Sequence, residues 1–181
     1  HAPPPQDQWV ALDLETTGLD TRRDAILSLA AVPVDAGGVR LSQRFERRVR
    51  PEREFGIDSI RHHRLLPSEL ADAEAAAEVV RAFLHWLGPR RLLGFHLRFD
   101  LAMLDPWIRA LTGGGLPNRG IDVAHVYERD LRLSRPQGDI ELSLDAVAAA
   151  LGIEPLGRHT ALGDACTTGL IWLALRARGA T

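Results

Sequence analysis

The chain has 181 residues, 45% of them hydrophobic, and a formal net charge of −2. This length is enough to bury one sizeable core, and no apolar run is long enough to span a membrane. The single cysteine, Cys166, excludes an intrachain disulfide framework and fits packing in a buried helix, so we expect a protein of the reducing cytoplasm.

Hydrophobic periodicity divides the chain into an early part rich in strands and a later part in which strands and helices alternate. We expect strands at 8–15, 25–34, 39–49, 91–95 and 121–123, and helices at 73–87, 98–111, 124–131, 144–151 and 161–177. Residues 51–72 are expected to form a loop with short helical turns. Hairpin-connected strands followed by strand–helix alternation predict an α/β fold with a mixed five-stranded sheet flanked by helices. We expect one domain over 8–178 and an extended or disordered segment over 1–7.

The first strand ends in two acids, Asp13 and Glu15. Side chains two positions apart on a strand point to the same side, so both carboxylates project together. Bringing two like charges out of water is unfavourable unless a cation or a proton intervenes. A hard divalent cation would satisfy both groups. Thr16, Thr17 and Gly18 follow with two hydroxyl groups and a residue that can adopt positive φ, which allows close approach to a ligand.

Two further acids lie at predicted helix starts. Asp100, in the string LLGFHLRFDLAML, falls in the first turns of helix 98–111. Asp164 opens the last helix, five residues after His159. Five helical residues rotate a side chain by about 140° relative to the first, so we place His159 on the preceding loop and Asp164 on the helix face toward Asp13 and Glu15.

Three strings in this order resemble the motifs of the DnaQ-like, DEDDh-type 3′-5′ exonucleases, a superfamily that includes the polymerase III proofreading subunit, ribonuclease T and oligoribonuclease. They are DLETTGL at 13–19, GFHLRFD at 94–100 and HTALGD at 159–164. Phe95 and His96 stand where the family has His and Asn. Each acid alone fits a solvated surface, and the conjunction of all three strings carries the resemblance, which spans about residues 8–178.

The resemblance implies a ribonuclease H-like fold and hydrolysis from a 3′ end to nucleoside 5′-monophosphates. It implies two divalent cations, Mg²⁺ or Mn²⁺, bound by Asp13, Glu15, Asp100 and Asp164, with His159 as the proton acceptor. Thr16, Thr17 and Leu19 would hold the terminal nucleotide. His63 resembles the family's His-Gly step near the 3′ nucleotide, although Arg64 replaces the glycine.

The expected partner is a nucleic acid with a free 3′ end. We expect no association with a membrane. DNA is the first expectation. An exoribonuclease of short RNA, and a catalytically silent nucleic-acid-binding module, are the alternatives, and a polymerase or other protein partner stays open, as does the oligomeric state. All 22 basic residues are arginine, and those of residues 44–53 are candidates for phosphate contacts.

Overall fold

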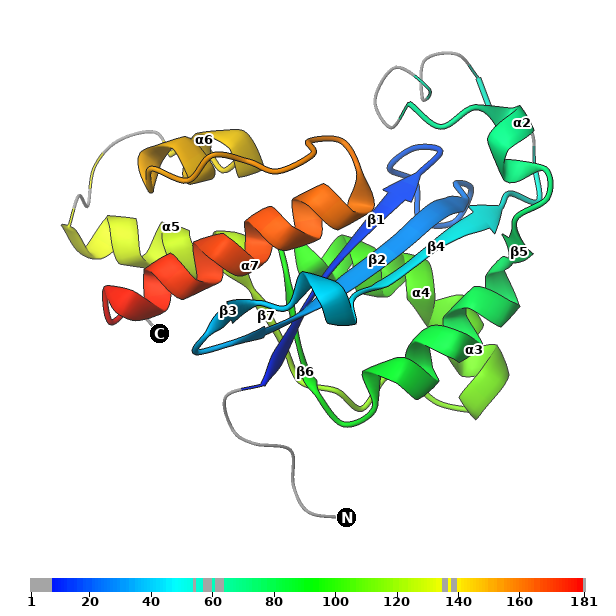
Figure 1. Cartoon of the computed structure of the whole chain (residues 1–181), viewed down its shortest axis with the longest axis horizontal. Helices are drawn as coiled ribbons and strands as arrows, with labels where there is room; N and C mark the ends of the chain where they lie inside the picture. The colour runs from blue at the N-terminus through cyan, green and yellow to red at the C-terminus, as the bar shows by residue number, and fades with distance from the viewer. Residues whose placement is uncertain are drawn as a thin grey trace.

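The computed structural model describes residues 8–53, 55–56, 60, 64–134, 137 and 140–180. The predictions for the segment 1–7 and for His63 fall outside these residues. Within the described part, a mixed sheet is covered by helices on both faces (Figure 1), which confirms the predicted fold class. No described helix combines the length and hydrophobicity needed to cross a bilayer.

The sheet has seven strands in the described residues, in the order β5-β4-β2-β1-β6-β7, with β3 paired to β2. This is two more than the predicted five, because the predicted strand 39–49 is divided in two and a two-residue strand at 74–75 is additional. The strands are β1 (Trp9–Thr16), β2 (Ile26–Asp35), β3 (Gly38–Val39), β4 (Phe45–Arg50), β5 (Glu74–Ala75), β6 (Arg91–Gly94) and β7 (Gly120–Asp122).

The predicted strand 39–49 is wrong as one continuous strand. A 3-10 turn, η1 (Leu41–Gln43), separates β3 from β4. Leu41 is exposed there, whereas Phe45 and Val49 are buried and alternate along β4. The apolar alternation therefore holds only in the second half of the predicted strand.

The helices follow the predicted segments closely, because their apolar residues recur at helical spacing. They are α2 (Pro67–Leu70), α3 (Ala76–Leu87), α4 (Leu97–Thr112), α5 (Val123–Ser134), α6 (Leu144–Ala150) and α7 (Ala161–Ala177). Ser143 caps α6, since its hydroxyl accepts a hydrogen bond from the Ala146 N–H at 3.2 Å.

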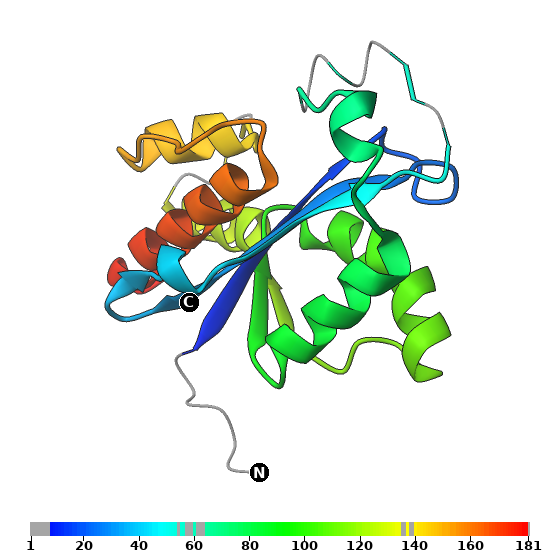
Figure 2. The ribbon, with the colours of Figure 1, turned by 45° about the vertical axis from the view of Figure 1, so that its right-hand side comes forward.

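Two hydrophobic clusters fill the layers on either side of the sheet. Val10, Leu12 and Leu14 of β1 pack into the cluster formed with α3 and α4. Trp9 and Ala11 pack into the cluster formed with α5, α6 and α7, which also buries Cys166. Figures 1 and 2 show these two helical layers on opposite faces of the sheet. The central strand β1 is thus apolar on both faces until its last residues.

Candidate active site

The strand β1 places Asp13 and Glu15 on the sheet face that packs against α7. Trp9 and Ala11 already belong to the cluster on that face, and side chains alternate along a strand. Asp13 and Glu15 therefore continue the same row at the C-terminal end of β1, where the apolar core stops.

Helix α7 brings the third carboxylate to this row. Its N-cap is Thr160, whose hydroxyl accepts a hydrogen bond from the Gly163 N–H at 3.1 Å. One turn into the helix, Asp164 reaches β1, so that one carboxylate oxygen each from Asp13, Glu15 and Asp164 lies within 4.8 Å of the others. The start of α7, orange in Figure 1, lies next to the end of β1. Acids from the two ends of the chain thus form a single group.

Asp100 reaches the same region from the other face of the sheet. The strand β6 pairs in parallel with β1, so its C-terminal end leads to the same edge, and α4 starts there. Asp100 is 3% exposed and lies outside the three-carboxylate group, although its charge is felt at Asp13.

The acids oppose one another's ionisation. Burial raises the pKa of Asp13 well above its usual range, and the charges of Asp100, Asp164 and Glu15 raise it further. Burial, followed by the charge of Asp164, raises the pKa of Glu15 to about 7. Burial also raises the pKa of Asp100. The site therefore favours bound protons or a cation over free carboxylates.

One arginine partly offsets this excess of negative charge. The Arg158 guanidinium contacts the carboxylates of Asp164 and Asp145, including a 3.1 Å bond to Asp145 Oδ2. Its charge opposes the rise in the pKa values of Asp13 and Glu15. Sequence reasoning did not include Arg158 or Asp145 in the site. The only local signal was the position of Arg158 beside His159, which could not indicate a partner on α6.

His159 lies on the loop before α7, as predicted, and its side chain is exposed. Its backbone adopts φ of 62°, a left-handed conformation that is uncommon for a non-glycine residue. Such outliers occur at functional sites more often than elsewhere. The imidazole is free of the core and adjoins the residue that contacts Asp164.

The turn after β1 is fixed by Asp24. The Thr17 hydroxyl donates to Asp24 Oδ1 at 2.8 Å and accepts from the Ala25 N–H at 2.9 Å. Gly18 does not use positive φ, contrary to the prediction. A Cβ there would stand 2.5 Å from Asp24 Oδ2, so the glycine instead makes room for the carboxylate. Leu19 next to it is 85% exposed.

The second motif is fixed by Asp122 at the end of β7. Its Oδ1 accepts from the N–H groups of His96 and Ala124, both at 3.1 Å. It therefore caps the start of α5 and also holds the turn that leads into α4 and Asp100.

The mixed α/β fold and the convergent carboxylates at the end of its central strand are the features to compare with known proteins. The family model RNase_T, described as exonuclease, matches residues 10–171. The chain therefore belongs to the DnaQ-like 3′-5′ exonuclease family.

Among curated proteins, DNA polymerase III PolC-type from Thermotoga maritima is 29% identical over 165 residues, which cover 91% of this chain and 12% of the polymerase. The chain thus spans about an eighth of that relative.

Solved structures share the fold. The match to cell-death related nuclease 4 covers 97% of this chain and 65% of that nuclease, with a TM-score of 0.79 and 17% identity. The match to E. coli exonuclease I, in complex with a dT13 oligonucleotide, covers 96% of this chain and 42% of exonuclease I, with a TM-score of 0.78 and 20% identity. The match to exonuclease X, in complex with 5′ overhanging duplex DNA, covers 94% of this chain and 93% of exonuclease X, with a TM-score of 0.72 and 22% identity.

Proposed function

We propose that this chain is a metal-dependent 3′-5′ exonuclease that hydrolyses phosphodiester bonds of DNA and releases nucleoside 5′-monophosphates. The observation that carries the proposal is the convergence of Asp13, Glu15 and Asp164 within 4.8 Å. A purely structural cluster of three partly buried acids would be costly, because each carboxylate opposes the ionisation of the others.

The donor chemistry fits hard divalent cations. The group offers only carboxylate oxygens, which suit Mg²⁺ or Mn²⁺ rather than softer metals. Asp13, Glu15 and Asp164 would hold the metal, and the buried Asp100 would complete the site from α4. When bound there, two such cations would supply an activated water and charge stabilisation at the leaving 3′-oxygen.

The other residues of the site have separate roles in this proposal. His159 accepts the proton of the attacking water, because it is an exposed imidazole on a loop that ends one turn before Asp164. The turn Thr16–Leu19 holds the terminal nucleotide, with the exposed Leu19 side chain against its base or sugar. His63 keeps its predicted role in binding the same nucleotide.

DNA is the proposed substrate because the T. maritima relative is a DNA polymerase, and because exonuclease I and exonuclease X of similar fold were solved with DNA. A polymerase as the physical partner of this exonuclease follows the same reasoning.

The test compares end-labelled oligonucleotides in Mg²⁺. A 3′-labelled DNA strand should lose its label as mononucleotide at once, whereas a 5′-labelled strand should give a descending ladder. A closed circle should resist, and excess EDTA should stop the reaction. Asp13→Asn should abolish turnover, with Asp35→Asn, an acid of the β2–β3 hairpin, as the matched control. Cleavage of circles or activity in EDTA would refute the proposal, and preference for RNA would reassign the substrate.

A further inference from the structure

Four arginines beside the candidate active site form a surface that we call the arginine rim: Arg22 and Arg23 of the β1–β2 loop, Arg50 at the end of β4, and Arg53 just after it. The guanidinium groups of Arg22, Arg50 and Arg53 make no ion pair with any described carboxylate, and Arg23 makes only a 3.7 Å contact with Asp20. Other arginines are neutralised locally, in the pairs Arg40–Asp35, Arg44–Glu46, Arg47–Glu74, Arg48–Glu69, Arg81–Glu78, Arg109–Asp105 and Arg132–Glu128.

The contrast is sharpest along β4 and at the residue just before it. Arg44, Arg47 and Arg48 each have a glutamate partner, whereas Arg50, nearest to the site, has none among the described residues. Positive charge is therefore left unbalanced at one end of the strand on a chain whose net charge is −2.

The rim adjoins the turn that follows the catalytic strand. A hollow of about 250 Å³ is lined by Thr17 together with Arg23 and Arg53. A second hollow of about 180 Å³ is lined by all four rim arginines. Since Arg23 and Arg53 line both, the two hollows adjoin, and the one nearer β1 includes Thr17.

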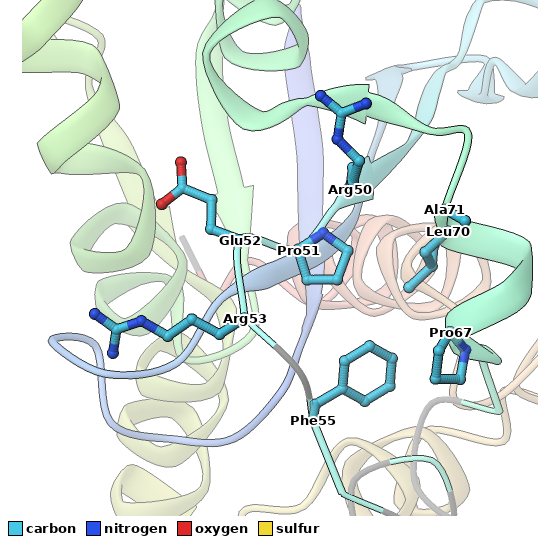
Figure 3. Close-up of a pocket in the computed structure, with 8 residues that line it drawn as sticks. All are labelled: Arg50, Pro51, Glu52, Arg53, Phe55, Pro67, Leu70 and Ala71. Carbon is cyan, nitrogen blue, oxygen red and sulfur yellow. The ribbon is translucent and has the colours of Figure 1, made fainter.

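A third hollow of about 500 Å³ lies on the other side of the same segment, between Pro51, Phe55 and α2. Figure 3 shows Arg53 extending from this hollow toward the β1–β2 loop, with the Phe55 ring facing Pro67. Arg50 and Arg53 thus border the solvent on both sides of the segment after β4.

Nearby acids only partly offset the positive charge of the arginine rim. The Asp24 carboxylate is occupied by the Thr17 hydroxyl and by the Asp20 N–H, each at 2.8 Å. Asp20 and Glu52 are the other acids of this surface. Solvated guanidinium groups without carboxylate partners are suited to phosphate, which they bind by charge-assisted hydrogen bonds.

We propose that the arginine rim binds the phosphates of nucleotides upstream of the 3′-terminal one, so that the preferred substrate is a strand of several nucleotides and not a dinucleotide. The proposal rests on the proposed function, because it takes the turn Thr16–Leu19 as the place of the terminal nucleotide. A positively charged groove that tracks the backbone is the usual way in which proteins hold single strands.

The test measures kcat and KM on a dinucleotide and on a 12-nucleotide DNA strand in Mg²⁺ at several salt concentrations. Counterion release of about 0.7 ions per phosphate on single strands predicts about a fivefold loss of affinity per arginine at 0.1 M salt. The double variant Arg50→Gln/Arg53→Gln should therefore raise KM for the 12-mer by about 25-fold. It should also reduce the salt slope, which is the slope of log KM against log salt concentration, by about 1.4. Its kcat and KM on the dinucleotide should stay at the wild-type values.

The control is Arg132→Gln on α5, which removes one charge from an exposed pair on the other face of the sheet. It should leave both substrates unaffected. Unchanged KM and salt slope for the 12-mer in the double variant would contradict the proposal that the arginine rim binds phosphates, while leaving the exonuclease proposal intact. Failure of the wild-type protein to hydrolyse either substrate would instead refute the proposed function. Equal losses on both substrates would indicate damage to the fold and would also contradict the rim.

Discussion

His159 combines an exposed side chain with a left-handed backbone on the loop that leads into α7. Positioned general bases contribute about 10²–10⁴-fold to turnover. We therefore expect His159→Ala to reduce kcat by that factor in Mg²⁺. The rise in melting temperature caused by Mn²⁺ should persist, because the imidazole is outside the carboxylate group. His125→Ala, which replaces another exposed histidine on α5, is the control. A lost Mn²⁺ effect would make His159 a metal ligand instead.

Glu15 links metal-free stability to pH. Its pKa rises from 4.5 to about 7 on folding, so the folded protein binds more protons than the unfolded chain between these values. Metal-free stability should therefore fall as the pH rises from about 4.5 to about 7. Glu15→Gln removes the contribution of Glu15 to this dependence, so its stability relative to the wild type should grow by about 2–3 kcal/mol across the interval.

Urea unfolding in EDTA at pH 5 and pH 8 measures this difference directly. Glu128→Gln, an exposed acid of α5, controls for the change in net charge. Parallel pH profiles for Glu15→Gln and the wild type would show that the Glu15 carboxylate ionises normally in the folded protein.

Arg158 competes with a cation for Asp164, because its guanidinium already contacts that carboxylate. We expect Arg158→Gln to tighten Mn²⁺ binding about fivefold, corresponding to about 1 kcal/mol for a partly exposed ion pair. Calorimetric titration with Mn²⁺ measures the change. Asp145→Asn frees Arg158 from α6 and leaves its contact with Asp164, so it should not tighten binding. Weaker binding in Arg158→Gln would mean that the arginine supports Asp164.

At the level of elements, the site depends on how the loop 156–160 packs on the first two turns of α7. The Thr167 hydroxyl accepts from the Leu156 N–H at 3.2 Å. A Cβ at Gly163 would lie 2.1 Å from the Gly157 carbonyl oxygen and 2.2 Å from that of Leu156. The loop that carries Arg158 and His159 can therefore lie this close to α7 only because position 163 has no side chain.

Gly163→Ala should push this loop away from the helix. We expect a loss of about 1–3 kcal/mol in the free energy of unfolding, as for other overpacked sites, together with a lower kcat because His159 moves. Urea unfolding and oligonucleotide kinetics measure both effects. Gly114→Ala, where a Cβ meets no atom within 4 Å, should change neither. A variant with full stability and activity would show that the loop adapts without cost.

For the whole molecule, metal binding should act as a folding ligand, since the carboxylates converge only in the folded chain. A cation at 100 times its Kd adds about 2.7 kcal/mol, which for a domain of this size raises the melting temperature by about 5–10 °C. Thermal unfolding with Mg²⁺ against EDTA measures the shift. Asp13→Asn should melt no lower than the wild type in EDTA and should lose most of the shift. An equal shift in Asp13→Asn would place the cations elsewhere.

The fold class followed from local patterns. The apolar run before Asp13, the helical spacing around Val79 and Phe83, and the alternation ending at Val49 each depend on neighbours in sequence, so their periods could be read directly. The continuous strand 39–49 was wrong because its first half lacks a buried face, and sequence alone does not show which residues around Leu41 leave the sheet.

By itself the sequence determined that Asp13 and Glu15 share one side of a buried strand and that Asp164 opens a helix, since both follow from fixed repeats of two and 3.6 residues. Only the tertiary structure decided which acids meet. The antiparallel and parallel pairings of β1 place α7 over Asp13 and Glu15 and bring Asp100 from the opposite face. The link between Arg158 and Asp145, and the unbalanced charge of the arginine rim, also depend on contacts between distant segments, because ion pairing depends on distance in space and not on separation along the chain.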